Sequence, residues 1–275
     1  MDLSVVREGL QEQKRIQSLM ELIPRKQRGA LLDVGTRDGY IAIKLSEFFE
    51  RVTALDLEKP EIHHDKITAV QGNITALDFP DNAFDVVLCA EVLEHLPPAV
   101  LGKACHELTR VAKEFVVIGV PYKQDIRVGR TTCFSCGGKN PPYGHVNSFD
   151  EQVLTRLFPH LSCERMTFVG ENTIQTNVLS TFLLDAAGNP YGTYSQEETC
   201  LQCGSQLTLP PPLNLSKRIL TKIALLLNRA QSHFITPRAD WIHLLFRKTK
   251  QRTVSYSVMG EEQSTPSATP TRVHP

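Results

Sequence analysis

Two short cysteine motifs of identical form stand far apart in this chain of 275 residues. The segments Cys133–Phe–Ser–Cys136–Gly and Cys200–Leu–Gln–Cys203–Gly are both C-x-x-C-G sequences, in which the glycine permits a sharp turn. Four thiolates complete the tetrahedral coordination of Zn²⁺ and give a closed structural site. The matched form of the pairs therefore predicts one structural zinc ion held by Cys133, Cys136, Cys200 and Cys203.

The spacing of the two pairs leaves other interpretations open. The 64 positions from Cys136 to Cys200 exceed the usual spacing of a zinc ribbon, so the intervening strands must bring the loops together. Two independent redox pairs and four free thiols are the alternatives. A redox C-x-x-C normally opens a helix in a thioredoxin-like context, and neither pair does. The other cysteines, in apolar segments typical of core residues, are Cys89, Cys105 and Cys163.

A glycine-containing turn follows the apolar run Leu31–Val34 and precedes a predicted helix. Such a turn lets a ligand approach the backbone closely. Gly35 and Gly39 do not form the G-x-G-x-x-G pattern, which argues against NAD. Asp33 is placed to hold an ammonium group, and Asp56, about 20 residues beyond the turn, to accept hydrogen bonds from ribose hydroxyls. Either aspartate, taken alone, could instead cap the end of a strand.

The segment 91–95, with sequence EVLEH, brings two carboxylates and an imidazole within five residues, and a second imidazole follows at position 145. Glu91 or His95 could act as a general base toward an acceptor hydroxyl or amine. Alternatively, Glu91, Glu94, His95 and His145 could bind a divalent cation. The structural alternative is that Glu94 and His95 close a turn between a strand and a helix. The candidate catalytic residues are Glu91, His95 and His145.

Strands and helices alternate through the first half of the chain. A helix is expected over the first 23 residues or so, and strands over 29–34, 51–57, 67–71, 84–90 and 113–120. Intervening helices are expected over 40–49 and 97–110. This rhythm predicts right-handed βαβ units in an α/β, Rossmann-like, doubly wound sheet of seven mostly parallel strands.

The alternation of strands and helices ends after Pro121. Residues 122–147 form a predicted cysteine-rich loop, followed by a helix over 149–158. Strands are expected over 161–169, 175–184 and 239–247, and an amphipathic helix over 213–234. The predicted divisions are an N-terminal helix (1–28), a ligand-binding α/β domain (29–184), a region with the second cysteine pair, amphipathic helix and last strand (185–247), and a disordered tail (248–275).

Three segments carry a resemblance to a known family. LLDVGTRDGYIAIKL resembles the first motif of class I S-adenosylmethionine (SAM)-dependent methyltransferases, and LDL around Asp56 resembles the second. QGNITALDFPDNAFDVVLCAEVLEHL resembles the stretch through the fourth strand in the ubiquinone/menaquinone-type branch. The resemblance covers residues 29–120 and extends more loosely to 184. It implies a Rossmann-like domain with SAM as cofactor.

The resemblance also implies roles for individual residues. Gly35 and Gly39 would line the methionine end of SAM, Asp56 would bind the ribose, and Asn73 and Ile74 would flank the adenine. The full implied set is Asp33, Gly35, Thr36, Gly39, Asp56, Leu57, Asn73, Ile74 and Ala90. The chain departs from the family at Thr36–Arg37, where small residues are usual, and at Asn73, where aspartate is usual. The set Glu91, Glu94, His95 and His145 resembles the metal site of small-RNA 3′-end 2′-O-methyltransferases.

Composition limits the partners. Thirty basic and thirty acidic residues give a formal net charge of zero, which argues against a nucleic-acid partner. The sequence has no signal peptide and no apolar run of about 18 residues, so a cytoplasmic protein without a transmembrane segment is expected. The helix 213–234 is expected to pack on the domain or on a homodimer partner rather than on a membrane.

These observations lead to a functional hypothesis. The chain is expected to transfer a methyl group from SAM to a small-molecule or glycan acceptor, at a hydroxyl. The alternatives are a metal-assisted RNA 2′-O-methyltransferase and a noncatalytic zinc-bearing binding protein that retains the methyltransferase shell.

Overall fold

The computed structural model describes residues 7, 9–24 and 29–249. Its main sheet has seven strands in the order β3-β2-β1-β4-β5-β9-β8. The strands are β1 (Ala30–Val34), β2 (Arg51–Asp56), β3 (Ile67–Gln71), β4 (Phe84–Ala90), β5 (Ala112–Pro121), β8 (Leu161–Val169) and β9 (Trp241–Lys248). The pairs among the first five are parallel, whereas β9 runs antiparallel to both β5 and β8. The seven-stranded, mostly parallel, Rossmann-like sheet is confirmed.

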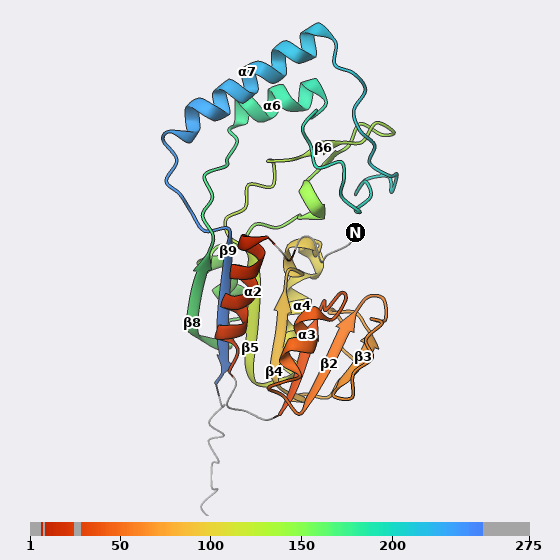
Figure 1. Ribbon diagram of the computed structural model, residues 1–275, viewed down its shortest axis with the longest axis vertical. Coiled ribbons are helices and arrows are strands. Elements are labelled where there is room, and N and C mark those ends of the chain that lie inside the picture. The colour runs from red at the N-terminus through yellow and green to blue at the C-terminus, as the bar shows by residue number, and fades with distance from the viewer. Residues whose placement is uncertain (1–6, 8, 25–28, 250–275) are drawn as a thin grey trace, which may run out of the picture.

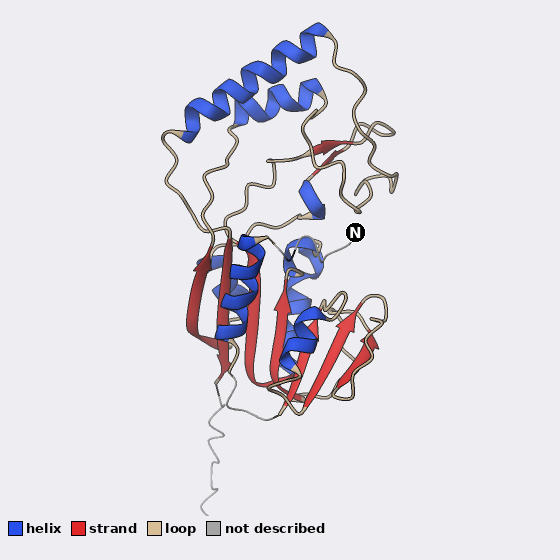
Figure 2. Ribbon diagram, in the orientation of Figure 1, coloured by secondary structure: helices blue, strands red, loops and turns tan. Residues whose placement is uncertain are grey.

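Helices cover both faces of this sheet (Figure 2). On one face, α4 (Pro98–Val111) and α5 (Glu151–Leu157) pack on residues such as Leu32, Val87 and Val116. On the other face, α2 (Leu10–Leu22) and α3 (Tyr40–Leu45) pack on strand residues such as Leu31, Leu88 and Val117. Each of these is adjacent in sequence to a residue that faces the first layer. Alternate residues of each strand therefore enter different cores, and this explains why β1 is buried at all five positions.

The rest of the chain forms a cap above the carboxyl edge of the sheet (Figure 1). It consists of residues 122–150 and 170–240, which leave the sheet after β5 and β8. Its elements are the short strands β6 (Thr131–Thr132) and β7 (Lys139–Asn140), the 3₁₀ helix η2 (Pro142–Gly144), and the helices α6 (Val178–Ala187) and α7 (Leu215–Ser232). A second 3₁₀ helix, η1 (Leu93–His95), follows β4 in the sheet domain. The separate buried cluster of the cap contains only Cys133, Tyr194, Cys200 and Leu207.

The predicted strand over 175–184 is wrong, because this segment begins helix α6. Asn177 caps the helix by accepting the backbone N–H of Ser180 at 2.8 Å, and the Ser180 hydroxyl in turn accepts the N–H of Asn177. This reciprocal capping box favours a helix over the apolar residues that follow it. The seventh strand is instead β9, and the last predicted helix runs from Leu215 to Ser232.

Parts of the predicted terminal segments lie outside the described residues. These are residues 1–6, 8 and 25–28 of the predicted N-terminal segment and residues 250–275 of the predicted tail. Among the residues that the structure does describe, no helix is both long enough and apolar enough to cross a bilayer.

The central strands should dominate the stability of the sheet domain. We expect Leu88→Ala, at a fully buried side chain of β4, to lower the free energy of unfolding by about 3 kcal/mol, because the lost side chain leaves a cavity. Urea unfolding measures this value. Leu209→Ala, at a side chain that is 79% exposed, is the matched control and should change it by less than about 0.5 kcal/mol. Equal effects of the two substitutions would contradict the described packing.

Candidate functional site

The turn after β1 places backbone at the carboxyl edge of the sheet. The N–H groups of Gly35 and Thr36 both donate to the carbonyl of Leu55, at 2.8 and 3.2 Å, which ties the turn to β2. Gly35 has φ 75° and Gly39, at the N-terminus of α3, has φ 79°. L-residues with a Cβ rarely adopt these angles, so both glycines are required by the turn. This is the edge at which open α/β sheets bind ligands.

Asp33 lies beneath this turn at the end of β1. Its side chain is buried and accepts the Thr36 hydroxyl at 2.7 Å. Burial raises the pKa of Asp33 to about 6, while the Thr36 hydrogen bond opposes the rise and the charge of Asp56 adds to it. A buried carboxylate with one hydroxyl donor is poorly compensated. A cation placed at the turn would therefore favour its ionised form.

The other predicted cofactor residues lie on the β2 and β3 side of the turn. Asp56 accepts the backbone N–H of Arg37 and that of Leu57, each at 2.7 Å, so its carboxylate lies directly against the glycine turn. The Asn73 side-chain oxygen accepts the N–H and the hydroxyl of Thr75, both at 2.9 Å, and Ile74 is buried. The Leu57 side chain is exposed.

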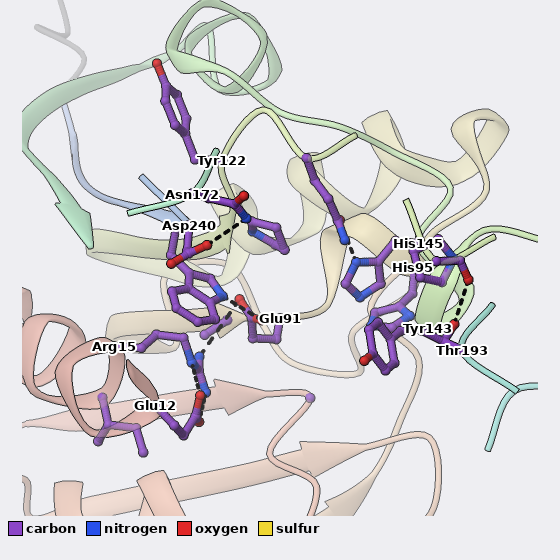
Figure 3. A pocket seen from close by; sticks show the side chains of 18 of the residues that line it. Glu12, Arg15, Glu91, His95, Tyr122, Tyr143, His145, Asn172, Thr193 and Asp240 are labelled. Atoms are coloured by element: carbon purple, nitrogen blue, oxygen red, sulfur yellow. Dashed lines mark hydrogen bonds and ion pairs between the residues drawn. The ribbon is translucent and has the colours of Figure 1, made fainter. Parts of the chain in front are cut away.

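A cavity of about 780 Å³ opens between the turn and the cap (Figure 3). Of the predicted cofactor residues, Gly35, Thr36 and Ala90 line it, whereas Asp33, Gly39, Asp56, Leu57, Asn73 and Ile74 do not. All three candidate catalytic residues line it as well, namely Glu91, His95 and His145. The structure thus joins the end of β4, the glycine turn and the cap in one concave space.

Glu91 follows β4 and has a positive φ of 58°. The Trp241 indole Nε1–H donates to Glu91 Oε2 at 3.2 Å, and Glu91 Oε1 lies 3.9 Å from the guanidinium of Arg15. Figure 3 shows Glu91 and Arg15 apart from His95 and His145 in the same pocket. Desolvation raises the pKa of Glu91, although Arg15 and the Trp241 hydrogen bond oppose the rise.

The two histidines lie against each other, one from the sheet domain and one from the cap. The rings of His95 and His145 are 4.6 Å apart in an edge-to-face arrangement. His145 Nδ1 lies 2.7 Å from Gln124 Oε1, which can only accept, so Nδ1 carries the proton and Nε2 has a free lone pair. Desolvation, assisted by the neighbouring His95, lowers the pKa of His145 to about 4, and desolvation also lowers the pKa of His95.

Glu94 completes a cluster with these histidines. Its side chain has no exposed surface, and neither carboxylate oxygen has a hydrogen-bond partner. One donor atom each from Glu94, His95 and His145 lies within 4.8 Å of the others, which is compatible with a cation site. Glu91 belongs to the Arg15–Trp241 group rather than to this cluster. Burial, with the nearby Glu91, raises the pKa of Glu94 well above its usual range.

Arg37, where the family usually has a small residue, connects the turn to the cap. Its guanidinium pairs with Glu197 at 3.0 Å and remains largely exposed. Arg37, Glu91 and Tyr143 all line the cavity, and all have φ values between 55° and 58°. Three non-glycine residues in the left-handed region around one cavity point to a functional constraint, because such conformations cost free energy that local contacts must offset.

The four cysteines of the two C-x-x-C-G motifs converge in the cap. Their sulfur atoms all lie within 4.8 Å of one another, with Cys133 to Cys203 and Cys136 to Cys200 both at 3.7 Å. None forms a disulfide. The backbone turns are alike, since Gly137 donates to the Cys133 carbonyl and Gly204 to the Cys200 carbonyl, both at 2.8 Å. The predicted convergence of the two loops is present, and the donor set fits tetrahedral Zn²⁺.

Some residues of this site escape sequence reasoning. Arg15 and Trp241 are 226 positions apart and meet only at Glu91, and Gln124 orients His145 from an irregular loop. No periodicity or local motif marks these three side chains, because their roles arise from long-range packing.

The comparisons with known proteins agree with this geometry. A family model described as "Methyltransferase domain" matches residues 32–117. The ubiquinone biosynthesis O-methyltransferase of Albidiferax ferrireducens is 29% identical over 92 residues, which are 29% of this chain and 36% of that protein. The chain therefore aligns with only about a third of the length of this relative.

Solved structures share the fold at low sequence identity. A Bacillus halodurans protein provisionally described as a methyltransferase has a TM-score of 0.54 at 15% identity, covering 85% of this chain and 98% of that chain. The Burkholderia thailandensis 1,6-didemethyltoxoflavin-N1-methyltransferase, with bound 1,6-didemethyltoxoflavin and S-adenosylhomocysteine, has a TM-score of 0.52 at 14% identity, covering 89% and 81%. The glycine turn, the strand order and the matched family model together identify residues 32–117 as the core of a class I SAM-dependent methyltransferase domain.

Proposed function

We propose that this chain transfers the methyl group of SAM to a hydroxyl of a small-molecule or glycan acceptor. The observation that carries the proposal is one cavity lined by the turn at Gly35 and Thr36 and also by the ionisable side chains of Glu91, His95 and His145. The A. ferrireducens relative is named as an O-methyltransferase, and the B. thailandensis structure holds a small-molecule substrate. The first supports a hydroxyl acceptor, whereas the second, named as an N1-methyltransferase, supports a small-molecule acceptor but not the hydroxyl.

The residues present suit SAM. When bound, SAM supplies an electrophilic methyl group on a sulfonium. Asp33 would neutralise its ammonium group, directly or through water, and Asp56 would accept from the ribose hydroxyls while it keeps the turn in place. Asn73 and Ile74 would flank the adenine. The buried, poorly compensated carboxylate of Asp33 is the feature of this structure that fits a cationic ligand.

Glu91 is the best placed general base. It lines the cavity at the end of β4, and desolvation moves its pKa upward from the usual carboxyl value, toward the range that suits proton transfer near neutral pH. Arg15 and Trp241 fix its orientation. His145, with a pKa of about 4, is a weak base, and its role is to position groups on the cap side of the cavity.

A divalent cation is the second candidate for activating the acceptor. The unpartnered oxygens of Glu94 favour it, because a buried carboxylate without donors is stabilised by a cation. His145 would offer Nε2, since Gln124 holds Nδ1, and such an outer hydrogen bond commonly orients a metal-ligating histidine. The ion would lower the pKa of an acceptor hydroxyl. Such a cation does not by itself indicate RNA, which the balanced charge of the chain argues against.

A structural zinc ion held by Cys133, Cys136, Cys200 and Cys203 completes the proposal. It would bind the two cap loops together and thereby hold the cap residues that line the cavity, such as Tyr143 and His145. We also propose that the protein acts in the cytoplasm. A homodimer and a noncatalytic binding role are tested by the measurements below and by sedimentation.

SAM binding is the first test. We expect calorimetric titration of the zinc-loaded protein to show binding in about the micromolar range, lost in Asp56→Ala. The affinity should fall as pH falls through about 6, because protonated Asp33 no longer neutralises the ammonium group.

The control for this titration is Asp33→Asn, which should bind weakly with little pH dependence over the same interval. Tight binding by Asp56→Ala would contradict the cofactor site. SAM binding without methyl transfer to any hydroxyl acceptor in a phenolic and glycan panel would favour the noncatalytic alternative.

Acceptor activation is tested with Glu91→Gln. We expect kcat to fall by roughly 10²- to 10⁴-fold with little change in SAM affinity, because the variant cannot accept a proton. In the wild type, kcat should fall as pH decreases through a pKa above 4.5, since the base must be ionised.

Glu198→Gln, which replaces another carboxylate that lines the cavity, is the matched control and should retain most activity. Full activity in Glu91→Gln, combined with loss of activity in Glu94→Gln and dependence on added Mg²⁺ or Mn²⁺, would reject the general base and establish the cation instead.

The zinc site is tested by metal analysis. We expect about one zinc per chain, and its loss in Cys136→Ser/Cys203→Ser, because two thiolates alone do not hold the ion. Limited proteolysis should then cleave the cap while the sheet domain resists.

Cys163→Ser changes an exposed cysteine outside the cluster and should keep the metal and the protease resistance. A metal-free wild-type protein with oxidised cysteines would show instead that the two pairs are redox-active.

A further inference from the structure

The helices α6 and α7 pack against each other as an antiparallel pair, although 27 residues separate them in the chain. Asn177, at the start of α6, donates to Gln231, near the end of α7, at 2.7 Å. The fully buried residues of the two helices are small ones, namely Ser180 and Ala187 on α6 and Thr221 and Ala224 on α7. Many of the large apolar side chains, among them Phe182, Leu215 and Leu226, are instead exposed, whereas the large apolar side chains of an ordinary amphipathic helix face the core.

The outer face of α7 is an apolar stripe. Leu215, Ile219, Ile223 and Leu226 recur at spacings of four, four and three residues, so they lie on one side of the helix. All four are exposed, Leu215 at 74% and Leu226 at 65%. The stripe is opposite to the buried Thr221, and Figure 1 shows α7 at the end of the molecule farthest from the sheet.

Basic side chains flank this stripe along one edge. Arg218, Lys222 and Arg229 are exposed and, at spacings of four and seven residues, share a neighbouring face. The α7 sequence contains four basic residues and neither Asp nor Glu. A chain with zero formal net charge therefore concentrates positive charge beside an exposed apolar helix face.

From this arrangement we infer that the outer face of α7 docks in the plane of an anionic lipid bilayer. An apolar stripe enters the boundary between headgroups and acyl chains, while the flanking basic residues contact acidic headgroups. The 18 residues of α7 extend about 27 Å, which is enough for a helix that lies along the surface.

A second copy of this chain is a poorer occupant of the same face. Pairing two α7 helices through their apolar stripes would bring the basic edges of both copies close together without acidic partners on either helix. Like charges at such close approach are unfavourable. An anionic bilayer satisfies both the apolar and the charged part of the surface, and the inference does not depend on the methyl-transfer proposal.

Vesicle sedimentation with the full, zinc-loaded chain tests the inference. We expect binding to phosphatidylcholine vesicles that contain about 30 mol% phosphatidylglycerol, much weaker binding to phosphatidylcholine alone, and loss of binding at high salt. Ile219→Asp/Leu226→Asp should weaken binding roughly tenfold or more, because two inserting side chains are replaced by anions. Arg218→Gln/Lys222→Gln should weaken it on anionic vesicles only.

The matched control is Leu209→Asp, at an exposed leucine in the loop before α7. It should bind vesicles as the wild type does, and an unchanged far-ultraviolet circular dichroism spectrum shows that every variant is folded. Absence of binding to anionic vesicles, or equal binding by Ile219→Asp/Leu226→Asp, overturns the inference. A dimer in analytical ultracentrifugation that this double variant dissociates also overturns it, and assigns the face to a second copy.

Discussion

The cap depends on the meeting of four sulfur atoms. Its own buried cluster has four members, two of which are cysteines, so apolar burial contributes little to ordering the cap. The two C-x-x-C-G turns come from the two separate cap segments, 122–150 and 170–240, and meet at their sulfur atoms. Since Tyr143 and His145 reach the cavity from the first segment, the shape of the candidate active site depends on the same convergence.

The sheet domain contributes the rigid half of the cavity. The ends of β1, β2 and β4 lie side by side, where the strand order reverses around β1 and β4, and this places Asp33, Asp56 and Glu91 along one edge. The cap lies over that edge, and its contacts with it include the pair of Arg37 with Glu197 and the edge-to-face rings of His95 and His145. Residues from both halves are needed to surround an acceptor.

The sequence predicts the parallel half of the fold well, because apolar runs such as 29–34 and 84–90 alternate with helical periodicity. The cap is predicted less well, since its order comes from long-range contacts. Residues 175–184 contain enough apolar side chains for a strand, and only the capping box at Asn177 favours a helix. In the site, the glycine turn and the cysteine pairs are local motifs, whereas the contact of Trp241 with Glu91 joins residues 150 positions apart.

The two ends of the larger cap segment lie next to each other. Val169 and Trp241 are partners in the sheet, and just beyond them Asn172 and Arg238 exchange both backbone hydrogen bonds. A segment whose ends meet in this way can be lengthened, shortened or replaced without disturbing the strands that carry it. The architecture thus allows acceptor specificity to evolve by exchange of a cassette, while the cofactor-binding domain stays unchanged.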